Sequence, residues 1–402
     1  MTPDELILAV MSTPEGRHNP YPLYRQLHET APVARSEMAP MWALTGYQDC
    51  HQVLRDPRFG KSDPDQPMSL LPGGAPRTRL KFARHSMLMV NPPDHTRLRG
   101  LVSREFTPRR VERLRESVET MTDEILDGLE PGESVDLMDA LAFPLPVRVI
   151  GELLGVPAEE RDDFRPLVLA AARSIEPSVS EEEMREADIA GQAQAEYFAD
   201  LLERRTAHPE DDLLSALIGV RDGSDKLSTD ELIATGILLF AAGFETTTNL
   251  IGNMVVTLLQ HPHQLQRVRD DRSLIPGTVD EVLRYESPVQ LDLRVAFEEV
   301  DLHGHHIEAG DAIITMLGAA NRDPEMIDDP DRFDVARGEV PLLSFATGIH
   351  YCLGANLARM EGQAVLTKLL DRFGTIELLD DQPAWRDRLT LRGLDHLNVT
   401  VA

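Results

Sequence analysis

The chain has very little cysteine. Cys50 and Cys352 are the two thiols among 402 residues. Two cysteines cannot build a disulfide framework or a zinc site made of several thiolates. We therefore expect a protein of a reducing compartment.

Basic residues are scarce too. The chain has 40 lysines and arginines against 68 aspartates and glutamates, a net charge of −28. This excess of acid argues against nucleic acid or an anionic membrane as the main partner. The apolar run from Leu6 to Met11 is too short for a signal peptide or a membrane span, and Asp4 and Glu5 stand where a signal peptide needs positive charge. We expect a cytoplasmic protein without nucleic-acid or membrane partners.

No repeat period appears in the series of helical patterns over residues 117–205. The composition is even, and 42% of the residues are hydrophobic, enough for a sizeable core. Strand patterns around residues 42–44, 291–295 and 312–315 interrupt a chain of mostly helical patterns. We expect one domain over residues 1–402, mainly α with small β-sheets. Its small β-containing lobe would comprise N-terminal residues and about 290–320, and the rest would form a large helical lobe.

The most informative stretch runs from Phe345 to Gly354 and reads Phe-Ala-Thr-Gly-Ile-His-Tyr-Cys-Leu-Gly. A helix pattern follows it to about Phe373. A thiol just before a helix lies near free N–H groups and the positive end of the dipole, which favour the thiolate that binds metals or attacks carbon. Gly348 and Gly354 have no Cβ and allow close backbone approach. The stretch therefore indicates a ligand cradle.

A second landmark is a long helix predicted from Ser228 to His261. Ser228 and Glu231 form a capping box, and Pro262 ends the helix. At about 1.5 Å per residue it would be a rod of roughly 50 Å. Because it is apolar on most faces, we expect it to be buried.

The middle of this helix carries polar residues, Ala241-Ala-Gly-Phe-Glu-Thr-Thr-Thr248. A membrane span is the competing interpretation of the apolar run, but Glu245, Asn249 and Asn253 interrupt it. A carboxylate inside a buried helix needs a partner or a function.

Four separated motifs now occur in order: Ala242-Gly-Phe-Glu-Thr246, Glu281-x-x-Arg284, Pro330-Asp-Arg-Phe333 and Phe345-x-x-Gly348-x-His350-x-Cys352-x-Gly354. Together they resemble the cytochrome P-450 haem-thiolate monooxygenases of the soluble bacterial type. Residues 91–99, 320–324 and 352–359 extend the resemblance. It implies the P-450 fold, a triangular prism with a long central helix and haem between that helix and the one after Cys352.

The resemblance implies haem b, iron protoporphyrin IX, as cofactor. Cys352 would be the proximal iron ligand, whose electron donation favours O–O cleavage. Cations and hydrogen-bond donors suit the haem propionates, and the motif-matched residues for this role are His95, Arg99, Arg294 and His350. The other expected cofactor contacts are Ala242, Phe345, Gly348 and Gly354. Each of the four propionate candidates, taken singly, could instead be an ordinary surface or capping residue.

Glu245 and Thr246 match the family's acid–alcohol pair, which delivers protons to dioxygen. A helix kink in which the threonine bonds back to the preceding turn is the alternative. Glu281, Arg284 and Arg332 match a buried ion network that supports the haem-side core; a common surface pair is the alternative for the first two. Where many similar chains have glycine, this one has Ala346, so we expect ordinary backbone there.

Electrons must come from other proteins, because no Gly-x-Gly-x-x-Gly follows a strand pattern and no residues remain for a flavin domain. We expect a ferredoxin and a ferredoxin reductase, docking on an arginine-rich stretch, residues 97–115. An ordinary solvated helix face is the alternative for this stretch. The protein itself is expected to be a monomer.

The expected substrate, with O2 as co-substrate, is a hydrophobic small molecule. It could be a macrolide, terpenoid, steroid or fatty acid, hydroxylated or epoxidised. The expected contacts lie in residues 62–90, 164–200, 239–246, 289–293 and 391–394. Arg77, Arg79, Lys81 and Arg84 would meet an acidic group or simply belong to a solvated loop. A peroxide-driven haem-thiolate enzyme, a non-enzymatic haem sensor and a purely structural helical protein are the other hypotheses.

Overall fold

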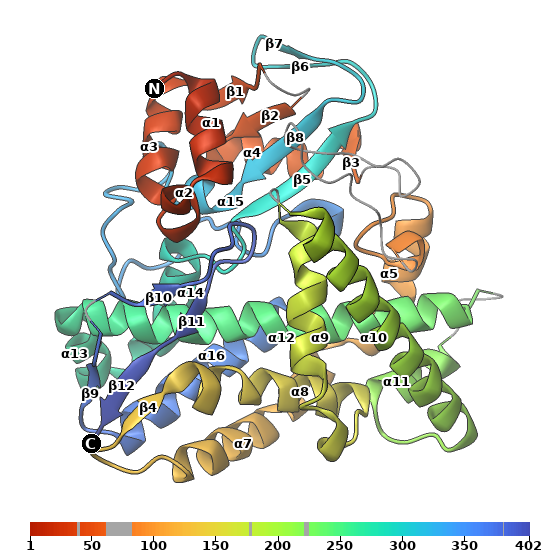
Figure 1. Cartoon of the computed structure of the whole chain (residues 1–402), viewed down its shortest axis with the longest axis vertical. Helices are drawn as coiled ribbons and strands as arrows, with labels where there is room; N and C mark the ends of the chain where they lie inside the picture. Colours follow the sequence, from red (N-terminus) through yellow and green to blue (C-terminus); the bar gives the residue numbers. More distant parts are fainter. Residues whose placement is uncertain (38–40, 62–82, 177–178, 221–224, 381) are drawn as a thin grey trace.

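The computed structural model describes residues 1–37, 41–61, 83–176, 179–220, 225–380 and 382–402. Most of these residues lie in helices, and small sheets border the helical part (Figure 1). The mainly helical fold with small sheets is as predicted. Among the described residues, no helix combines the length and the apolar character that crossing a membrane requires.

The largest sheet has the strand order β1-β2-β8-β5-β3. Its central pair, β2 and β8, is parallel, and its other pairs are antiparallel. The strands are β1 (Val33–Arg35), β2 (Met41–Leu44), β3 (Phe59–Gly60), β5 (Leu291–Ala296) and β8 (Ala312–Met316). The sheet thus joins N-terminal strands with strands from about 290–320, where strand patterns were predicted.

Helices cover both faces of this sheet, and the alternation of side chains explains why. In β2, Met41 and Ala43 pack in one core cluster with residues of α1 and α3, while Trp42 and Leu44 pack in another with residues of α4. Successive side chains of a strand point to opposite faces, so a strand covered on both faces is apolar throughout. The helices of this part are α1 (Pro3–Ser12), α2 (Pro14–His18), α3 (Tyr21–Thr30), α4 (Tyr47–Arg55) and α15 (Leu317–Ala320).

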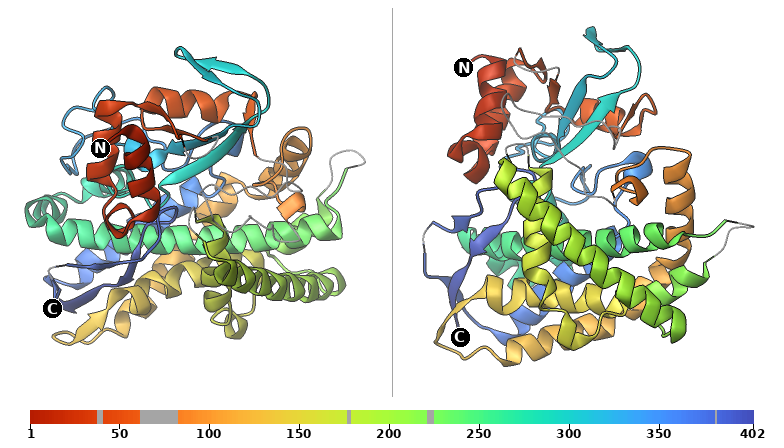
Figure 2. Two further views of the ribbon diagram at one scale, coloured as in Figure 1. Left: turned by 45° about the horizontal axis from the view of Figure 1, so that its top comes forward. Right: turned by 45° about the vertical axis from the view of Figure 1, so that its right-hand side comes forward.

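Helix α12 (Thr229–Gln260) crosses the middle of the helical part (Figures 1 and 2). Its start is the predicted capping box: the Glu231 N–H donates to Ser228 Oγ at 3.3 Å, and the Ser228 N–H donates to Glu231 Oε2 at 2.7 Å. His261 is its C-cap, and Pro262 begins the next helix. Most of its residues are buried, because neighbouring helices surround it.

The helices that pack on α12 include α8 (Pro144–Leu154), α10 (Glu181–Ala207), α14 (Ile275–Tyr285) and α16 (Ala355–Arg372). Close approach on α12 depends on missing side chains: a Cβ at Gly236 would come within 2.6 Å of the Phe198 ring on α10. The remaining helices are α5 (Asp94–Glu105), α6 (Pro108–Arg113), α7 (Arg115–Asp127), α9 (Phe164–Ala171), α11 (Leu213–Gly219) and α13 (Pro262–Asp270). Short helical turns η1 to η6 connect some of them.

Smaller sheets lie around the C-terminus and the first sheet. The order β4-β12-β9 makes a three-stranded antiparallel sheet, and β6-β7 and β10-β11 are two-stranded. Their bounds are β4 (Ser134–Asp136), β6 (Val300–Leu302), β7 (His305–Ile307), β9 (Ile376–Leu378), β10 (Ala384–Trp385), β11 (Leu394–His396) and β12 (Asn398–Val401). The segment between β10 and β11 contacts α12, where Arg388 bonds to Glu245.

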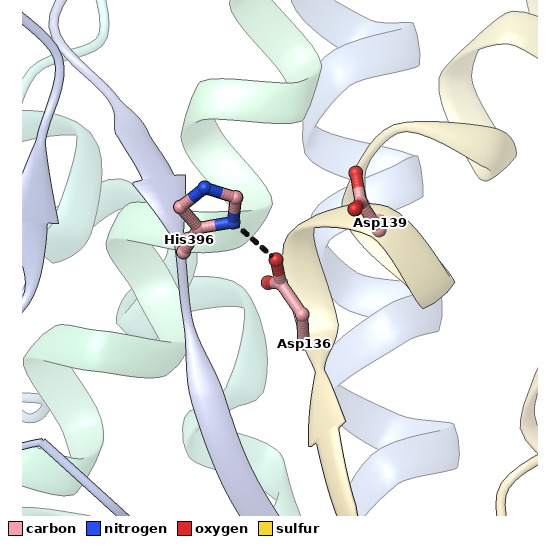
Figure 3. A group of neighbouring side chains, drawn as sticks. All are labelled: Asp136, Asp139 and His396. Atoms are coloured by element: carbon pink, nitrogen blue, oxygen red, sulfur yellow. Dashed lines mark hydrogen bonds and ion pairs between the residues drawn. The ribbon is translucent and has the colours of Figure 1, made fainter.

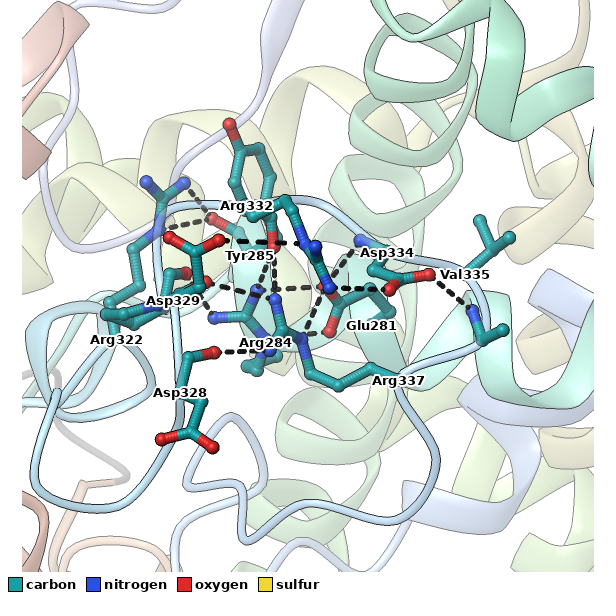
Figure 4. A network of polar contacts seen from close by, with 12 residues as sticks. Glu281, Arg284, Tyr285, Arg322, Asp328, Asp329, Arg332, Asp334, Val335 and Arg337 are labelled. Carbon is teal, nitrogen blue, oxygen red and sulfur yellow. Dashed lines mark hydrogen bonds and ion pairs between the residues drawn. The ribbon is translucent and has the colours of Figure 1, made fainter.

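A buried ion network joins α14 to the segment before the Cys352 stretch (Figure 4). Arg284 donates to both carboxylate oxygens of Glu281, at 2.7 and 2.9 Å, and to the carbonyls of Asn321, Pro330 and Arg332. The Arg337 Nε also donates to Glu281, at 3.2 Å.

The prediction that the Arg332 side chain joins this network is wrong. That side chain is 59% exposed and pairs with Asp334 at 3.0 Å, so only the Arg332 carbonyl contributes. Phe333, the next residue, takes the inward position, with its ring 5.4 Å from that of Tyr285. Arg337, which lies outside the motifs identified in the sequence, supplies the second cation instead.

Candidate active site

The Cys352 stretch forms a closed loop in front of α16. The Cys352 N–H donates to the Phe345 carbonyl at 3.0 Å, and the guanidinium of Arg359, on α16, lies 4.5 Å from the Phe345 ring centroid. A 3₁₀ turn, η6 (Gly348–His350), lies inside the loop, and α16 begins three residues after Cys352. The loop therefore holds the thiol at the start of a helix, as predicted.

Burial works against the thiolate at Cys352. It raises the pKa of this thiol above the ordinary value, although the Gly354 N–H and the charges of Arg99 and Arg359 lower it. The helix start thus contributes in the predicted direction, but burial outweighs it. A metal cation at Sγ would supply the further positive charge that deprotonates a thiol.

The prediction of ordinary backbone at Ala346 is wrong. Its φ is +54°, in the left-handed region, which explains why glycine suits this position in similar chains. The N–H of Ala346 donates to the Leu343 carbonyl at 2.8 Å, which holds the turn. Gly348 also has a positive φ, +72°, and a Cβ there would collide with the Leu54 carbonyl at the end of α4. Glycine at position 348 therefore allows the two backbone segments to approach each other.

Two imidazoles meet beside this loop. His95 on α5 is 3% exposed, and its ring centroid lies 4.3 Å from that of His350. Within the described part of the chain, neither ring nitrogen of His95 has a hydrogen-bond partner, and neither has His350 Nε2. Burial and the nearby charges of Lys61, Arg294 and His95 lower the pKa of His350 to about 3. Polar atoms buried in this way call for an acceptor or donor from a bound group.

Arg294 on β5 adds a cation to the same place. It is 1% exposed, its Nη1 donates to Asp292 at 2.6 Å, and its Nη2 has no partner among the residues the structure describes. Asp292 also accepts from Lys61 Nζ at 2.6 Å. Burial raises the pKa of Asp292, but Arg294 and Lys61 outweigh it and hold the pKa below its usual range. Asp292 thus orients the two cations Lys61 and Arg294. The sequence analysis did not predict this role of Asp292, although the pattern Asp292-x-Arg294 could have indicated it.

Arg99 connects α5 to the Cys352 loop through a donor bond from Nη2 to the Tyr351 carbonyl at 2.6 Å. His95, His350 and Arg294 each have a nitrogen without a hydrogen-bond partner among the described residues. The two imidazole rings are in contact, and the charge of Arg294 acts on both. Such donors suit carboxylates, and a flat dicarboxylate ligand with a metal at its centre would satisfy both them and Cys352. The residues present fit a haem, as the resemblance implied.

On α12 the Ala241–Thr248 segment has a partly exposed strip, formed by Ala242 and Thr246, and a buried face that includes Glu245. Ala242 is exposed and Thr246, one turn later, is half-buried. The Thr246 hydroxyl donates to the Ala242 carbonyl at 2.6 Å. This is the back-bond that we considered as the alternative to a catalytic role, although α12 continues unbroken through it.

Glu245 is 1% exposed, and its partners come from the other end of the chain. Arg388 Nη1 donates to its Oε1 at 2.6 Å, and Arg386 Nη1 lies 3.6 Å from the same atom. Burial raises the pKa of Glu245, while Arg388 and Arg386 oppose the rise. Sequence reasoning missed both arginines. Their signal was Arg386-x-Arg388-x-x-x-Arg392 near the end of an acid-rich chain.

The expected substrate segments meet partly at aromatic rings. Phe164 on α9 lies 4.4 Å from the Tyr197 ring on α10 and 4.6 Å from the Phe240 ring on α12. Val289 and Leu391, from two other expected segments, face each other in a β-bridge. Residues 62–82 of the expected loop, with Arg77, Arg79 and Lys81, lie outside the described residues.

The arginine-rich stretch is partly neutralised within the protein. Arg97 pairs with Glu231, Arg110 lies within 4 Å of Glu105 and Asp211, and Arg115 pairs with Glu112 at 2.6 Å. The arginines of this stretch on α5 and α6 that are exposed are Arg104, Arg109 and Arg113.

One further cluster has the composition of a metal site. Asp136, Asp139 and His396 bring one ligand atom each within 4.8 Å of one another (Figure 3). Each carboxylate already has a protein partner: His396 Nδ1 lies 2.6 Å from Asp136, and Arg165 donates to Asp139 at 2.6 Å. Asp136 also accepts the N–H groups of Met138 and Leu397, so the cluster fastens β4 to the turn before β12.

Comparisons with known proteins identify the family of this chain. The family model for cytochrome P450 matches residues 147–390. Two relatives come from Saccharopolyspora erythraea. Cytochrome P450 107B1 is 42% identical over 400 residues, covering 96% of this chain and 95% of the relative. The 6-deoxyerythronolide B hydroxylase is 43% identical over 396 residues, covering 94% and 95%.

A solved structure of P450BioI, in complex with hexadec-9Z-enoic acid ligated acyl carrier protein, superimposes with a TM-score of 0.88 at 37% identity. It covers 96% of this chain and 98% of its own. The family match spans more than half of the chain, and the relatives match nearly full length. The chain therefore belongs to the cytochrome P450 family and is a haem-dependent monooxygenase.

Proposed function

We propose that this monooxygenase hydroxylates or epoxidises a hydrophobic small molecule with electrons from a separate ferredoxin and ferredoxin reductase. In such a reaction one atom of O2 enters the substrate and the other leaves as water, which consumes two electrons and two protons. The observation that carries the proposal is the buried carboxylate of Glu245 beside the Ala242–Thr246 strip of α12. An enzyme that activates O2 has a use for a proton donor at that place.

Cys352 is proposed to hold the haem iron through its thiolate, which would supply electron density that favours O–O cleavage when haem is bound. His95, His350, Arg294 and Arg99 are proposed to hold the propionates. In the part of the chain that the structure describes, the first three have nitrogens without a hydrogen-bond partner, which supports this assignment. Phe345, Gly348, Gly354 and Ala242 remain proposed cofactor contacts.

Glu245 and Thr246 are proposed to move protons to the reacting oxygen. A hydroxyl at Thr246 can hold a water molecule, and Glu245 can donate to it, provided that Thr246 rotates away from the Ala242 carbonyl. A peroxide-driven enzyme is the second candidate, since it would share Cys352 but receive its oxygen already reduced. Consumption of NADH through a ferredoxin system with little product, beside fast product formation from hydrogen peroxide, would favour that candidate.

The substrate is proposed to be apolar, because Phe164, Tyr197 and Phe240 and the Val289–Leu391 pair belong to the expected substrate segments. The relatives suggest two classes to test. One is a macrolactone, from the name of the 6-deoxyerythronolide B hydroxylase, and the other is a fatty acyl chain, free or on a carrier protein, from the P450BioI complex.

The test is a titration of the ferric haem protein with 6-deoxyerythronolide B, with hexadec-9Z-enoic acid and with the same acid on an acyl carrier protein. A saturable shift of the haem absorption, followed by an oxygenated product under NADH, ferredoxin and reductase, identifies the class. No shift with any of the three, at concentrations up to their solubility, would exclude both classes.

The ferredoxin is proposed to dock near α5 and α6. Arg104, Arg109 and Arg113 are exposed there. Arg99 on the same α5 contacts the Cys352 loop, in which Ile349 and Tyr351 are 50% and 44% exposed. An apolar centre with basic neighbours suits an acidic partner.

A further inference from the structure

The segment between β10 and β11 contacts three buried carboxylates through hydrogen bonds and ion pairs. Arg388 and Arg386 reach Glu245, the N–H groups of Leu389 and Thr390 donate to Glu176 at 2.9 and 3.0 Å, and Arg392 pairs with Glu286. The three carboxylate residues are 1%, 7% and 7% exposed, in that order. The segment therefore concentrates positive charge and N–H donors where the protein buries negative charge.

The two oxygens of the Glu245 carboxylate have different surroundings. Arg388 and Arg386 both approach Oε1. Oε2 is buried and has no hydrogen-bond partner in the part of the chain that the structure describes. A carboxylate oxygen in that position is costly unless it is protonated or bound to water. One oxygen is thus fixed, and the other is available to carry a proton.

The same network reaches the surface. Arg386 lies 7% exposed between Glu245 and Asp395, with its Nε 3.3 Å from Asp395 Oδ1, and the Asp395 side chain is 57% exposed. Arg386 Nη1 has no hydrogen-bond partner among the described residues, since 3.6 Å to Glu245 is too long for one. A solvent-exposed carboxylate and a buried one are therefore linked through a single guanidinium.

We propose that Arg388 and Arg386 are positioning residues for Glu245: Arg388 holds Oε1 by a hydrogen bond, Arg386 adds positive charge on the same side, and Oε2 is left to give up a proton. This inference rests on the proposed proton-delivery role of Glu245. When Oε2 releases its proton, the two guanidinium groups stabilise the carboxylate that forms. A proton from solvent then restores the carboxyl group, so no electrons are exchanged in the cycle.

The charges that face Glu245 define what each arginine does. Arg388 and Arg386 favour its ionised form, while burial and the charge of Glu176 favour the protonated form. Removing Arg388 should therefore make Glu245 hold its proton to higher pH. If the two arginines only tethered the C-terminal segment to α12, their removal would lower stability without shifting the pH midpoint at which Glu245 is protonated.

The experiment is an infrared pH titration of the haem-loaded protein, in which the carboxyl band lost in Glu245→Gln identifies Glu245. Arg388→Gln should shift its midpoint upward by about 1–3 pH units, because a cation within 4–6 Å lowers a carboxyl pKa by that much. Arg388→Lys should shift it less. Arg386→Gln, which removes the more distant cation, should shift it upward as well and serves if Arg388→Gln does not fold.

The matched control is Arg205→Gln, which breaks another buried ion pair, Arg205 with Asp212 at 2.6 Å, without touching Glu245. It should leave the Glu245 band where it is. An unchanged midpoint in Arg388→Gln and Arg386→Gln would overturn the inference. Failure of the proposed function is seen separately: in that case Glu245→Gln would leave the ratio of hydrogen peroxide released to NADH consumed unchanged.

Discussion

Arg284 donates to both oxygens of the Glu281 carboxylate, at 2.7 and 2.9 Å, and neither side chain is more than 3% exposed. Its other donors serve three backbone carbonyls of the segment that leads to the Cys352 loop. Removal of one partner from a buried ion pair leaves an uncompensated charge and costs about 3–5 kcal/mol. We expect Arg284→Ala to lower the free energy of unfolding by that amount and to reduce the yield of haem-loaded protein, measured by denaturant unfolding and the haem-to-protein absorbance ratio.

Arg332→Ala is the matched control for this prediction. Its side chain is mostly exposed and its contribution to the network is a backbone carbonyl, which alanine keeps. We expect a change within about 0.5 kcal/mol and normal haem content, as for most surface substitutions. Equal losses in the two variants, or normal haem content in Arg284→Ala, would contradict the assigned roles.

Much of this fold could be predicted from local signals. The capping box at Ser228, the proline at 262 and the apolar surface between them fixed the limits of α12. The Cys352 loop was visible from its glycines and the helix pattern that follows. These features depend on residues close in sequence, so a pattern can report them.

Long-range partners could not be predicted in the same way. Glu245 is 143 residues from Arg388, and no local pattern says which arginine a buried carboxylate meets. Arg337 pairs with Glu281 where the Arg332 side chain was predicted, because Phe333 is the residue of this segment that points inward. The positive φ of Ala346 was missed because alanine disfavours it; the surrounding loop, held by the Leu343 carbonyl, imposes it.

Thr246→Ala tests the proposed proton delivery. Removal of the hydroxyl should keep haem binding but release reduced oxygen as hydrogen peroxide, with product per NADH falling at least several-fold, since positioned proton transfer is worth about 10²–10⁴-fold in rate. Thr235→Ala is the control, because Thr235 makes the same kind of back-bond on α12, to the Glu231 carbonyl at 2.7 Å. If the two variants couple NADH to product equally well, Thr246 has only the structural role.

Charge reversal tests the proposed docking surface. Arg109→Glu with Arg113→Glu should slow reduction by ferredoxin roughly 10-fold or more at low salt and weaken its salt dependence, because electrostatic steering changes association rates by 10–10³-fold. Stopped-flow reduction at several ionic strengths measures both effects. Arg25→Glu, on α3 on the other side of the molecule in Figure 1, is the control for a charge reversal away from this surface. Rates that ignore both salt and the double reversal would remove this surface from the account.

His396 gives a pH dependence with a defined sign. The hydrogen bond that the protonated His396 ring donates to the Asp136 carboxylate raises the pKa of this exposed imidazole above its ordinary value. A raised pKa in the folded state means that the contact stabilises fully below the unfolded pKa and is lost as pH rises through the folded pKa. We expect His396→Gln to lower stability at pH 5.5 but hardly at pH 9, measured by urea unfolding, and NMR titration to place the His396 midpoint above the usual value near 6.5. An effect of equal size at both pH values would show that this protonation contributes nothing.

The central claim is that Cys352 is the thiolate ligand of a haem held between its loop and α12. The most direct measurement is the absorption spectrum of the dithionite-reduced, carbon monoxide-bound protein, with Cys352→His as the comparison. We predict the red-shifted Soret band that thiolate ligation gives in the native protein and its loss, with haem retained, in Cys352→His. A native protein that binds haem but gives the band of a nitrogen-ligated iron, or a Cys352→His variant with an unaltered spectrum, would contradict the account.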